Sequence, residues 1–270
     1  MSTKQAIEKT FGRPFRTLTA AQINTGLNTA IAGVAWQQRK IELRRSAKQK
    51  AIILESGLTA INQFKNGPRI FAERIGTFGY IRFENSLGDV ATVDEFKRAL
   101  ESMLDTEALV LDFRNTPSGG NTTVARAVLG HFTQTEKAYQ VHEPINEARL
   151  TGVKRKFIEL VAPRSPHYSK PIAVLAGAWT GSMGEGMVIG LDALDAKFII
   201  GAPMADLLGG LGSFNLKKSP AYIEMGVERL YHVNGTARED FVPSVLLVPA
   251  DTDVDGSDPA LNKAISLLDD

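Results

Sequence analysis

The 270-residue sequence contains no cysteine. That single absence excludes disulfide bonds, zinc sites built from thiolates and a cysteine nucleophile. It leaves the compartment undecided, because a reducing cytosol and an oxidising periplasm both accept a chain without thiols. The sequence also lacks a His-x-x-x-His pair, a carboxylate cluster with ligand spacing and a Gly-x-Gly-x-x-Gly run between a strand and a helix. We therefore expect neither a metal nor any other cofactor.

Long apolar runs and an excess of charge are missing too. No stretch of 18 or more apolar residues occurs, which excludes a transmembrane helix of ordinary length. Residues 1–9 carry charges of both signs with no apolar run behind them, unlike a secretory signal, although a chain trimmed of its signal would look the same. The formal net charge of +1 provides no overall attraction to nucleic acid or anionic membranes. We expect no nucleic-acid partner and no membrane insertion.

The first 70 residues have the patterning of a helical segment. Apolar residues recur at three- and four-residue steps after Thr19, which is suited to capping a helix: Ile23, Leu27, Ile31 and Val34. Residues 39–50 then carry six lysines and arginines against the single acidic Glu42. This cluster is compatible with a phosphate- or acid-binding patch, but no aromatic residue is interleaved with the charges. The sequence favours a solvated helix face there.

From residue 76 to the end, the pattern changes to alternating strands and helices. Short apolar runs typical of buried strands are each followed by a turn, and the first three also by a segment with helical spacing. The expected strands are 79–83, 108–113, 171–176 and 197–200, and the expected helices are 93–104, 122–132 and 183–194. Short strands and a closing helix over 258–268 follow. This repetition predicts an α/β core (76–270) with a mainly parallel sheet, preceded by the helical segment 1–70.

Ser182 directly follows one of the predicted strands and directly precedes a helix, within Trp-Thr-Gly-Ser-Met-Gly-Glu-Gly (179–186). A serine on such a turn is exposed at the carboxyl edge of the sheet, near the positive end of the helix. Gly181 and Gly184 allow a tight turn and the approach of a substrate. Two interpretations stay open on this basis, namely a nucleophile and a simple helix N-cap, which serine also favours.

A second glycine-rich turn, Ser118-Gly119-Gly120, lies at the same place on another strand-helix unit. The backbone amides of Gly119 and Gly120, together with that of Met183, can point at a developing oxyanion. The alternative is a loop that uses glycine for its left-handed backbone. A Gly-Gly turn and a serine turn on separate units of one sheet support each other.

Two of these segments resemble a known family. The run Ala-Leu-Val-Leu-Asp-Phe-Arg-Asn-Thr-Pro-Ser-Gly-Gly (108–120) resembles the strand and Asp-Leu-Arg-Asn-Asn-Pro-Gly-Gly turn of the tail-specific, or carboxyl-terminal processing, serine peptidases, with one inserted residue. Residues 179–186 are similar to their Ser-Ala-Ser-Glu nucleophile turn. The resemblance places the attacking serine at Ser182 and the glutamate that follows it at Glu185.

Two further segments extend the resemblance over about seven-tenths of the chain. Residues 79–83 resemble the Gly-Tyr-Ile-Arg strand that opens the catalytic core of that family. Residues 234–239 with Val242-Pro243 resemble its closing Asp-Gly-Thr…Glu…Pro-Asp segment. The order and spacing agree from about residue 76 to the end. The resemblance implies a crotonase/Clp-protease-like ββα core that acts on peptide bonds, and an extracytoplasmic (periplasmic) location.

The chain departs from the family where the base should be. Tail-specific peptidases use a Ser-Lys dyad, and the position 25 residues after the serine is Leu207. The tricorn-like branch uses an early histidine and a late glutamate; Glu239 matches that glutamate, but no histidine precedes His131. The family's inserted PDZ domain has no room before a core that starts near residue 76.

A replacement base can be sought among the four histidines. His131 follows the Gly-Gly turn on a helix, and His167 lies in a proline-rich loop, so both favour a structural role. His142 and His232 lie in extended segments and are equal candidates. A Ser182–His232–Glu239 arrangement would satisfy the order of nucleophile, base and orienting group. The third outcome is a chain with no base at all.

Two functions follow from these observations. We favour a serine-type hydrolase that cleaves peptide bonds through Ser182, with the Gly119, Gly120 and Met183 amides as its oxyanion hole and a peptide or protein as its substrate. The alternative is a non-catalytic member of the same fold that binds peptides or chain termini, and Leu207 is its motivation. A homo-oligomer is compatible with both functions.

Overall fold

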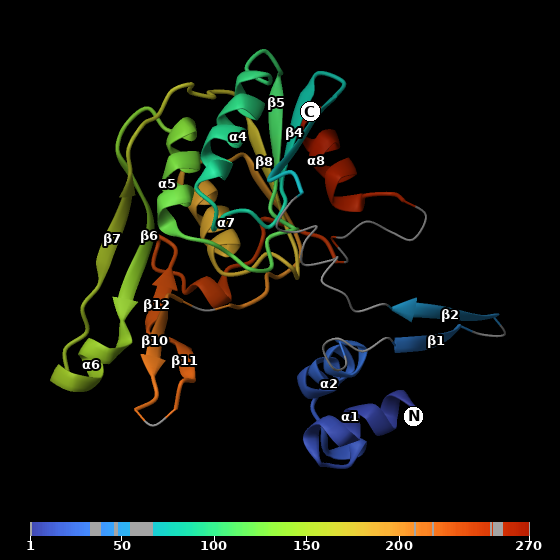
Figure 1. Ribbon diagram of the computed structural model, residues 1–270. Helices are drawn as coiled ribbons and strands as arrows, with labels where there is room; N and C mark the ends of the chain where they lie inside the picture. The colour runs from blue at the N-terminus through green and yellow to red at the C-terminus, as the bar shows by residue number, and fades with distance from the viewer. Residues whose placement is uncertain are drawn as a thin grey trace. The chain divides into compact units, whose positions relative to one another are not determined.

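The computed structural model shows two compact units, Met1–Gly67 and Pro68–Asp270, and each is treated by itself (Figure 1). The structure describes residues 2–32, 39–45, 48–54, 67–207, 209–217, 219–248, 250 and 256–269.

The first unit begins with a small helical hairpin. Its elements are α1 (Thr3–Phe11), the 3-10 turn η1 (Phe15–Thr17) and α2 (Ala20–Ala32). Ser2 and Gln5 cap α1 reciprocally, since the Ser2 amide donates to Gln5 Oε1 at 2.9 Å and the Gln5 amide donates to Ser2 Oγ at 3.3 Å. The buried Ile7 packs on Gly26, where a Cβ would lie 2.8 Å from Ile7 Cγ2. Helices are therefore confirmed at the start of the predicted N-terminal segment, over residues 3–32, whereas Val34 lies outside the described residues.

The basic stretch that follows is a β-hairpin. Strands β1 (Arg39–Arg45) and β2 (Lys48–Leu54) pair antiparallel, with Arg39 opposite Leu54. The expectation that helix continues over residues 39–50 is therefore wrong. The physical reason is visible in the sequence, because Ile41 and Leu43 alternate with charged residues at a period of two, which is the period of a strand.

The second unit is built on a six-stranded sheet that is mainly parallel, as the sequence predicts. Its strand order is β13-β9-β8-β5-β4-β3, and only the edge strand β3 runs antiparallel. The strands are β3 (Ile70–Ile75), β4 (Phe78–Phe83), β5 (Ala108–Asp112), β8 (Ile172–Ala176), β9 (Phe198–Gly201) and β13 (Val245–Leu246).

Helices cover both faces of this sheet, which explains the continuous apolar runs of β5 and β8. The helices α4 (Ala91–Glu101), α5 (Thr122–Leu129) and α7 (Met183–Ala193) lie on one side, and α8 (Pro259–Asp269) lies on the other (Figure 1). Leu111 and Val174 belong to the core under the first group of helices, whereas Val110 and Leu175 pack with Ala260 of α8. Every residue of β5 and β8 is buried, as expected of central parallel strands.

An antiparallel subdomain is built from two separate segments of this unit, residues 137–161 and 211–231. Its three-stranded sheet has the order β12-β6-β7, and a separate hairpin pairs β10 with β11. Figure 1 shows β6 and β7 reaching away from the central sheet, with α6 at their far end. The elements are β6 (Lys137–Pro144), α6 (Ile145–Thr151), β7 (Phe157–Val161), β10 (Leu211–Asn215), β11 (Tyr222–Gly226) and β12 (Glu228–Tyr231); the 3-10 turns η2 (Gly130–Phe132) and η3 (Arg238–Asp240) complete the fold.

A buried arginine holds the closing helix against the end of β5. The Arg114 guanidinium donates to Asp112 Oδ2 at 2.6 Å, to Asp258 Oδ2 at 2.7 Å and to the Ala250 carbonyl at 2.7 Å. Burial opposes its charge, but the two carboxylates raise the pKa of Arg114. The chain therefore leaves β5 from a fixed point, which positions the turn at residues 115–120.

Within the described ranges, no helix is long and apolar enough to cross a bilayer. The same ranges contain no group of three or more histidine, aspartate or glutamate side chains placed to hold a metal ion.

Candidate active site

Ser182 lies at the carboxyl edge of the central sheet, on the turn between β8 and α7, where the sequence places it. Its backbone has φ +52° and ψ −110°, a conformation that residues with a side chain rarely adopt. Such strain costs on the order of 1–3 kcal/mol and persists only where the surroundings impose it. Ser182 is half-buried rather than enclosed by apolar side chains. The turn has the strained strand-to-helix form that exposes the nucleophilic serine of α/β-hydrolases.

The Glu185 carboxylate binds the backbone of the serine turn. Its Oε2 atom accepts the Ser182 amide at 2.6 Å, and its side chain is 0% exposed. Burial raises the pKa of Glu185, and the nearby Arg238 and the amides that it accepts lower it only in part. Ser182 is also the N-cap residue of α7. A role as nucleophile and a role as N-cap are therefore compatible at this position. Its hydroxyl therefore belongs to the positive end of a helix.

Gly119 touches the serine directly. A Cβ at Gly119 would lie 2.4 Å from Ser182 Cβ, 2.8 Å from Ser182 Oγ and 2.9 Å from the Met183 nitrogen. Its φ of +65° also favours glycine. The structure thus brings together the Gly-Gly turn after β5 and the serine turn after β8. Only a residue without a side chain allows so close an approach.

The amides of the predicted oxyanion hole differ in their partners. The Gly119 amide donates to the Thr116 carbonyl at 3.0 Å. Gly120 packs on Leu87, where a Cβ would lie 2.2 Å from the Leu87 carbonyl oxygen. Among the described residues, the amides of Gly120 and Met183 donate to no protein acceptor. These two N–H groups are free to bind an incoming oxygen atom.

A pair of threonines joins the two turns. Thr116 and Thr180 form a parallel bridge, and both hydroxyls donate to the Phe113 carbonyl, at 2.7 and 3.1 Å. The Thr116 carbonyl also accepts the Gly181 amide at 3.2 Å. A Cβ at Gly184 would lie 2.1 Å from Thr116 Oγ1, so the turns are in close contact. Sequence reasoning missed this pair, although each threonine follows an apolar strand by a few residues.

Comparison with known families identifies the chain. Residues 77–243 match the model of peptidase family S41, which is more than half of the 270 residues. The protein belongs to peptidase family S41. This is a family of serine peptidases, and the resemblance of the motifs at residues 79–83, 108–120 and 179–186 agrees with it.

Solved structures of S41 proteins share the fold. A putative peptidase from Parabacteroides merdae superposes with a TM-score of 0.62 at 14% identity, over 98% of this chain and 88% of that one. The photosystem II D1 C-terminal processing protease superposes with a TM-score of 0.61 at 18% identity, over 83% of this chain and 59% of that one. Mature CPAF superposes with a TM-score of 0.61 at 15% identity, over 85% of this chain and 67% of that one. At these identities the likeness establishes the fold alone.

Leu207 lies beside the serine turn. It is the residue 25 positions after Ser182, where tail-specific peptidases have the lysine of their dyad. A Cβ at Gly181 would lie 2.9 Å from Leu207 Cδ1. The Leu207 amide donates to Glu185 Oε2 at 3.2 Å, and the Leu207 carbonyl accepts a hydrogen bond from the Arg238 guanidinium. The side chain is 47% exposed. In this S41 protein an apolar group therefore stands where the dyad lysine is expected.

The His142 ring contacts two glutamates and not Ser182. Its Nδ1 lies 2.9 Å from Glu228 Oε2 on β12, and its Nε2 lies 3.0 Å from Glu159 Oε2 on β7. Gln140 also contacts Nε2 at 2.9 Å, and the ring stacks on Phe157. Burial disfavours the imidazolium, but the two carboxylates outweigh it and raise the pKa of His142. The His142 side chain thus joins the three strands of the β12-β6-β7 sheet.

This arrangement predicts a dependence of stability on pH. The pKa of His142 is higher in the folded chain than in the unfolded chain, so the ring stabilises the fold fully below its ordinary value of about 6.5. That contribution is lost as the pH rises through the folded value. We expect the denaturation midpoint of the wild type, minus that of His142→Gln, to fall from pH 6 to pH 9. The variant serves as the control, because burial lowers the pKa of His131 and acts in the opposite direction in both chains. A difference that is constant over this range would contradict the assignment.

His232 and Glu239 do not form the predicted arrangement with Ser182. His232 Nδ1 accepts the Asn234 amide at 3.1 Å, and His232 Nε2 lies 3.2 Å from Asp192 Oδ2. Asp192 is ten residues after Ser182 on α7, which corresponds to about 15 Å along the helix. Glu239 Oε1 instead pairs with Arg229 at 2.6 Å. His232 is therefore separated from Ser182 by most of the length of α7. The closeness of His232 and Glu239 in the sequence carries no information on this distance.

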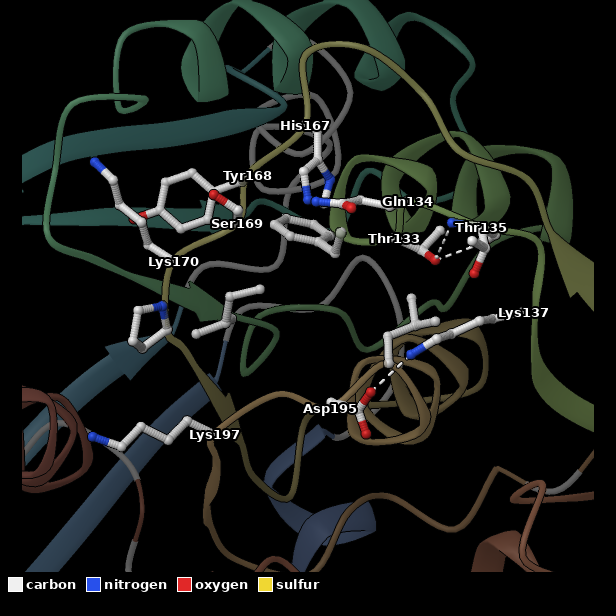
Figure 2. A pocket seen from close by; sticks show the side chains of 14 residues that line it. Thr133, Gln134, Thr135, Lys137, His167, Tyr168, Ser169, Lys170, Asp195 and Lys197 are labelled. Carbon is white, nitrogen blue, oxygen red and sulfur yellow. Dashed lines mark hydrogen bonds and ion pairs between the residues drawn. The ribbon is translucent and has the colours of Figure 1, made fainter.

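A hollow of about 670 Å³ lies at the opposite edge of the sheet from Ser182. It is lined by Ile172, at the start of β8, and by Asp195, which follows α7, whereas Ser182 lies at the other end of both elements. Figure 2 shows Lys137 paired with Asp195 in this hollow, at 2.8 Å, with His167 and Gln134 above them. The hollow is therefore separate from the candidate active site.

Proposed function

We propose that this S41 protein is a serine-type peptidase in which Ser182 Oγ attacks the carbonyl carbon of a peptide bond. The observation that carries the proposal is the strained Ser182 backbone beside two free amides, those of Gly120 and Met183. A nucleophile on a rigid turn with amide donors alongside is the arrangement that acyl transfer requires.

The chemistry proceeds in two steps. Attack by Ser182 Oγ gives a tetrahedral intermediate whose oxyanion accepts hydrogen bonds from the amides of Gly120 and Met183. The C–N bond then breaks, and the amine leaves with the proton that Ser182 Oγ lost, which solvent water carries between them. The acyl group stays on Ser182 until a water molecule attacks it, which releases the carboxylic acid and returns a proton to Ser182 Oγ. Gly119 allows the close approach because it carries no side chain. Its own amide donates to the Thr116 carbonyl and is therefore not one of the two donors. Each donor of this kind contributes about 10²–10³ in rate.

The proton of the serine has no acceptor in the place of the dyad lysine, since Leu207 fills that place. Two carboxylates hold the His142 ring, and His232 Nε2 lies 3.2 Å from Asp192 Oδ2 with no hydrogen-bond partner in the described structure. Either ring could act on Ser182 only after it leaves its present place. We therefore expect slow acylation. An oxyanion hole and substrate binding alone still provide about 10³–10⁴ over the reaction in water.

The surroundings of the serine favour an apolar substrate side chain. Trp179, three residues before Ser182, is 63% exposed, and Leu207, which lies against Gly181, is 47% exposed. Such apolar groups at a site gain free energy when a substrate covers them, at about 25 cal/mol per Å². We propose a peptide or protein substrate with an apolar residue next to the cleaved bond. The resemblance to tail-specific peptidases supports cleavage near a carboxyl terminus.

Labelling with a fluorophosphonate tests the nucleophile. We expect a stoichiometric mass adduct on the wild type and none on Ser182→Ala, because the probe reacts with an activated serine. Ser118→Ala is a matched control, since Ser118 is an exposed serine on the neighbouring turn whose Oγ accepts from Asn85 at 2.9 Å. Equal labelling of wild type and Ser182→Ala would refute the assignment.

A second function, peptide binding without turnover, is favoured by Leu207 in the place of the lysine. It predicts saturable binding of apolar peptides, with neither cleavage nor probe labelling over days. Cleavage that disappears in Ser182→Ala would exclude it. The same purified chain serves for both measurements.

A further inference from the structure

A buried ion pair lies directly behind the serine turn. The Arg238 side chain is 2% exposed and comes from η3, far along the chain from α7. One of its terminal nitrogens, Nη2, lies 3.6 Å from Glu185 Oε2 and donates to the Leu207 carbonyl. Burying both charges is expensive unless they hold something in place.

The pair connects three segments through one oxygen atom. Glu185 Oε2 accepts the amides of Ser182 and Leu207, at 2.6 and 3.2 Å, while Arg238 neutralises it and binds the Leu207 carbonyl. The peptide groups on both sides of Leu207 are thus fixed by one ion pair. The same carboxylate fixes the amide of the strained Ser182.

The cluster is not arranged for stability alone. Glu185 Oε1, Arg238 Nε and Glu239 Oε2 are buried without a hydrogen-bond partner in the described structure. Each such atom has lost its water without gaining a partner, which is unfavourable, and an apolar pair of similar volume would avoid that cost. Buried groups retained at such a cost are concentrated at functional sites.

We propose that Arg238 is a positioning residue, which keeps Glu185 ionised and thereby holds the Ser182 and Leu207 backbones in the geometry for attack. The proposal rests on the proposed function of Ser182. Without the guanidinium, burial favours the neutral carboxyl, which is a weaker acceptor for the two amides. Both segments then lose their anchor.

The first test is the pH profile of fluorophosphonate labelling in Arg238→Met. We expect the rate constant at neutral pH to fall by about 10²-fold, as for a misplaced nucleophile. We also expect the acid limb of the profile to move to higher pH than in the wild type. Arg238→Lys keeps the charge and should restore the position of that limb. Loss of stability alone would lower the folded fraction but leave the limb unmoved, and that result would overturn the proposal.

The second test uses hydrogen exchange and needs no activity. In Arg238→Met, amides in peptides covering 178–187 and 203–207 should exchange about 10-fold faster or more, and those of β5 should not. The surface variant Arg74→Met is the control, because Arg74 pairs with the exposed Asp105. Unchanged exchange at both segments would overturn the proposal.

The two tests separate the proposal from the proposed function. A wild type that is never labelled refutes Ser182 as the nucleophile, while faster exchange in Arg238→Met would still support the positioning role. Normal labelling of both the wild type and Arg238→Met, with identical profiles, refutes the positioning role alone. Should Arg238→Met not fold, Glu185→Gln provides the same comparison, with a profile that lacks the acid limb as the expected result.

Discussion

Leu207→Lys is expected to raise the rate of fluorophosphonate labelling and of peptide cleavage by about 10²–10⁴, the usual contribution of a positioned base. Leu207 already lies against Gly181, and its backbone is held by Glu185 and Arg238. A lysine there would start from the same Cα position and reach toward Ser182 Oγ. The adjacent Arg238 charge disfavours the ammonium form, so a useful fraction of neutral amine is expected.

The controls for this variant are specific. Leu211→Lys adds the same charge at a leucine that is 66% exposed on β10, and it should leave the rate unchanged. The double variant Leu207→Lys with Ser182→Ala should be inactive. A rate for Leu207→Lys equal to that of the wild type would mean that position 207 is not the place of the base.

Gly119→Ala is expected to abolish labelling at Ser182 and to destabilise the fold. The new methyl group would lie 2.4 Å from Ser182 Cβ, which no side-chain rotation can relieve. Overpacking of this kind costs typically about 1–3 kcal/mol, in addition to the cost of a left-handed backbone. Because the serine turn must shift, we expect the labelling rate to fall by at least about 10²-fold.

Gly76→Ala is the matched control for Gly119→Ala. Gly76 has nearly the same backbone conformation, with φ +61° against +65°, but nothing lies within 4 Å of its would-be Cβ. The two variants share the conformational cost, so the difference in their unfolding free energies reports the contact with Ser182. Equal effects on stability and normal labelling would show that the two turns do not touch in solution.

The sequence was informative where local pattern and tertiary structure coincide. The apolar runs at β5 and β8 predict central parallel strands because nothing polar could occupy positions buried on both faces. Once those strands are in place, Ser182 and Gly119 must follow them at one edge of the sheet, which is why their proximity could be foreseen.

The parts that escaped prediction depend on contacts between distant segments. Arg238 and Glu185 are 53 positions apart, from the numbering, and no local pattern announces their pairing. His142 looks like a candidate base in sequence, because its two glutamate partners come from other strands. The β1-β2 hairpin is weakly marked in the sequence for another reason, since only Ile41 and Leu43 carry the alternation of β1 within a densely charged stretch.

The peptide groups flanking residue 207 are fastened by Glu185 and Arg238, so the course of the main chain there is independent of the side chain it carries. Every amino acid placed at this position is therefore presented to Ser182 from the same origin and direction. A saturation library at residue 207 would consequently compare acids, bases and apolar groups on a constant scaffold. The family's chemistry could be surveyed at one codon, without remodelling the loop.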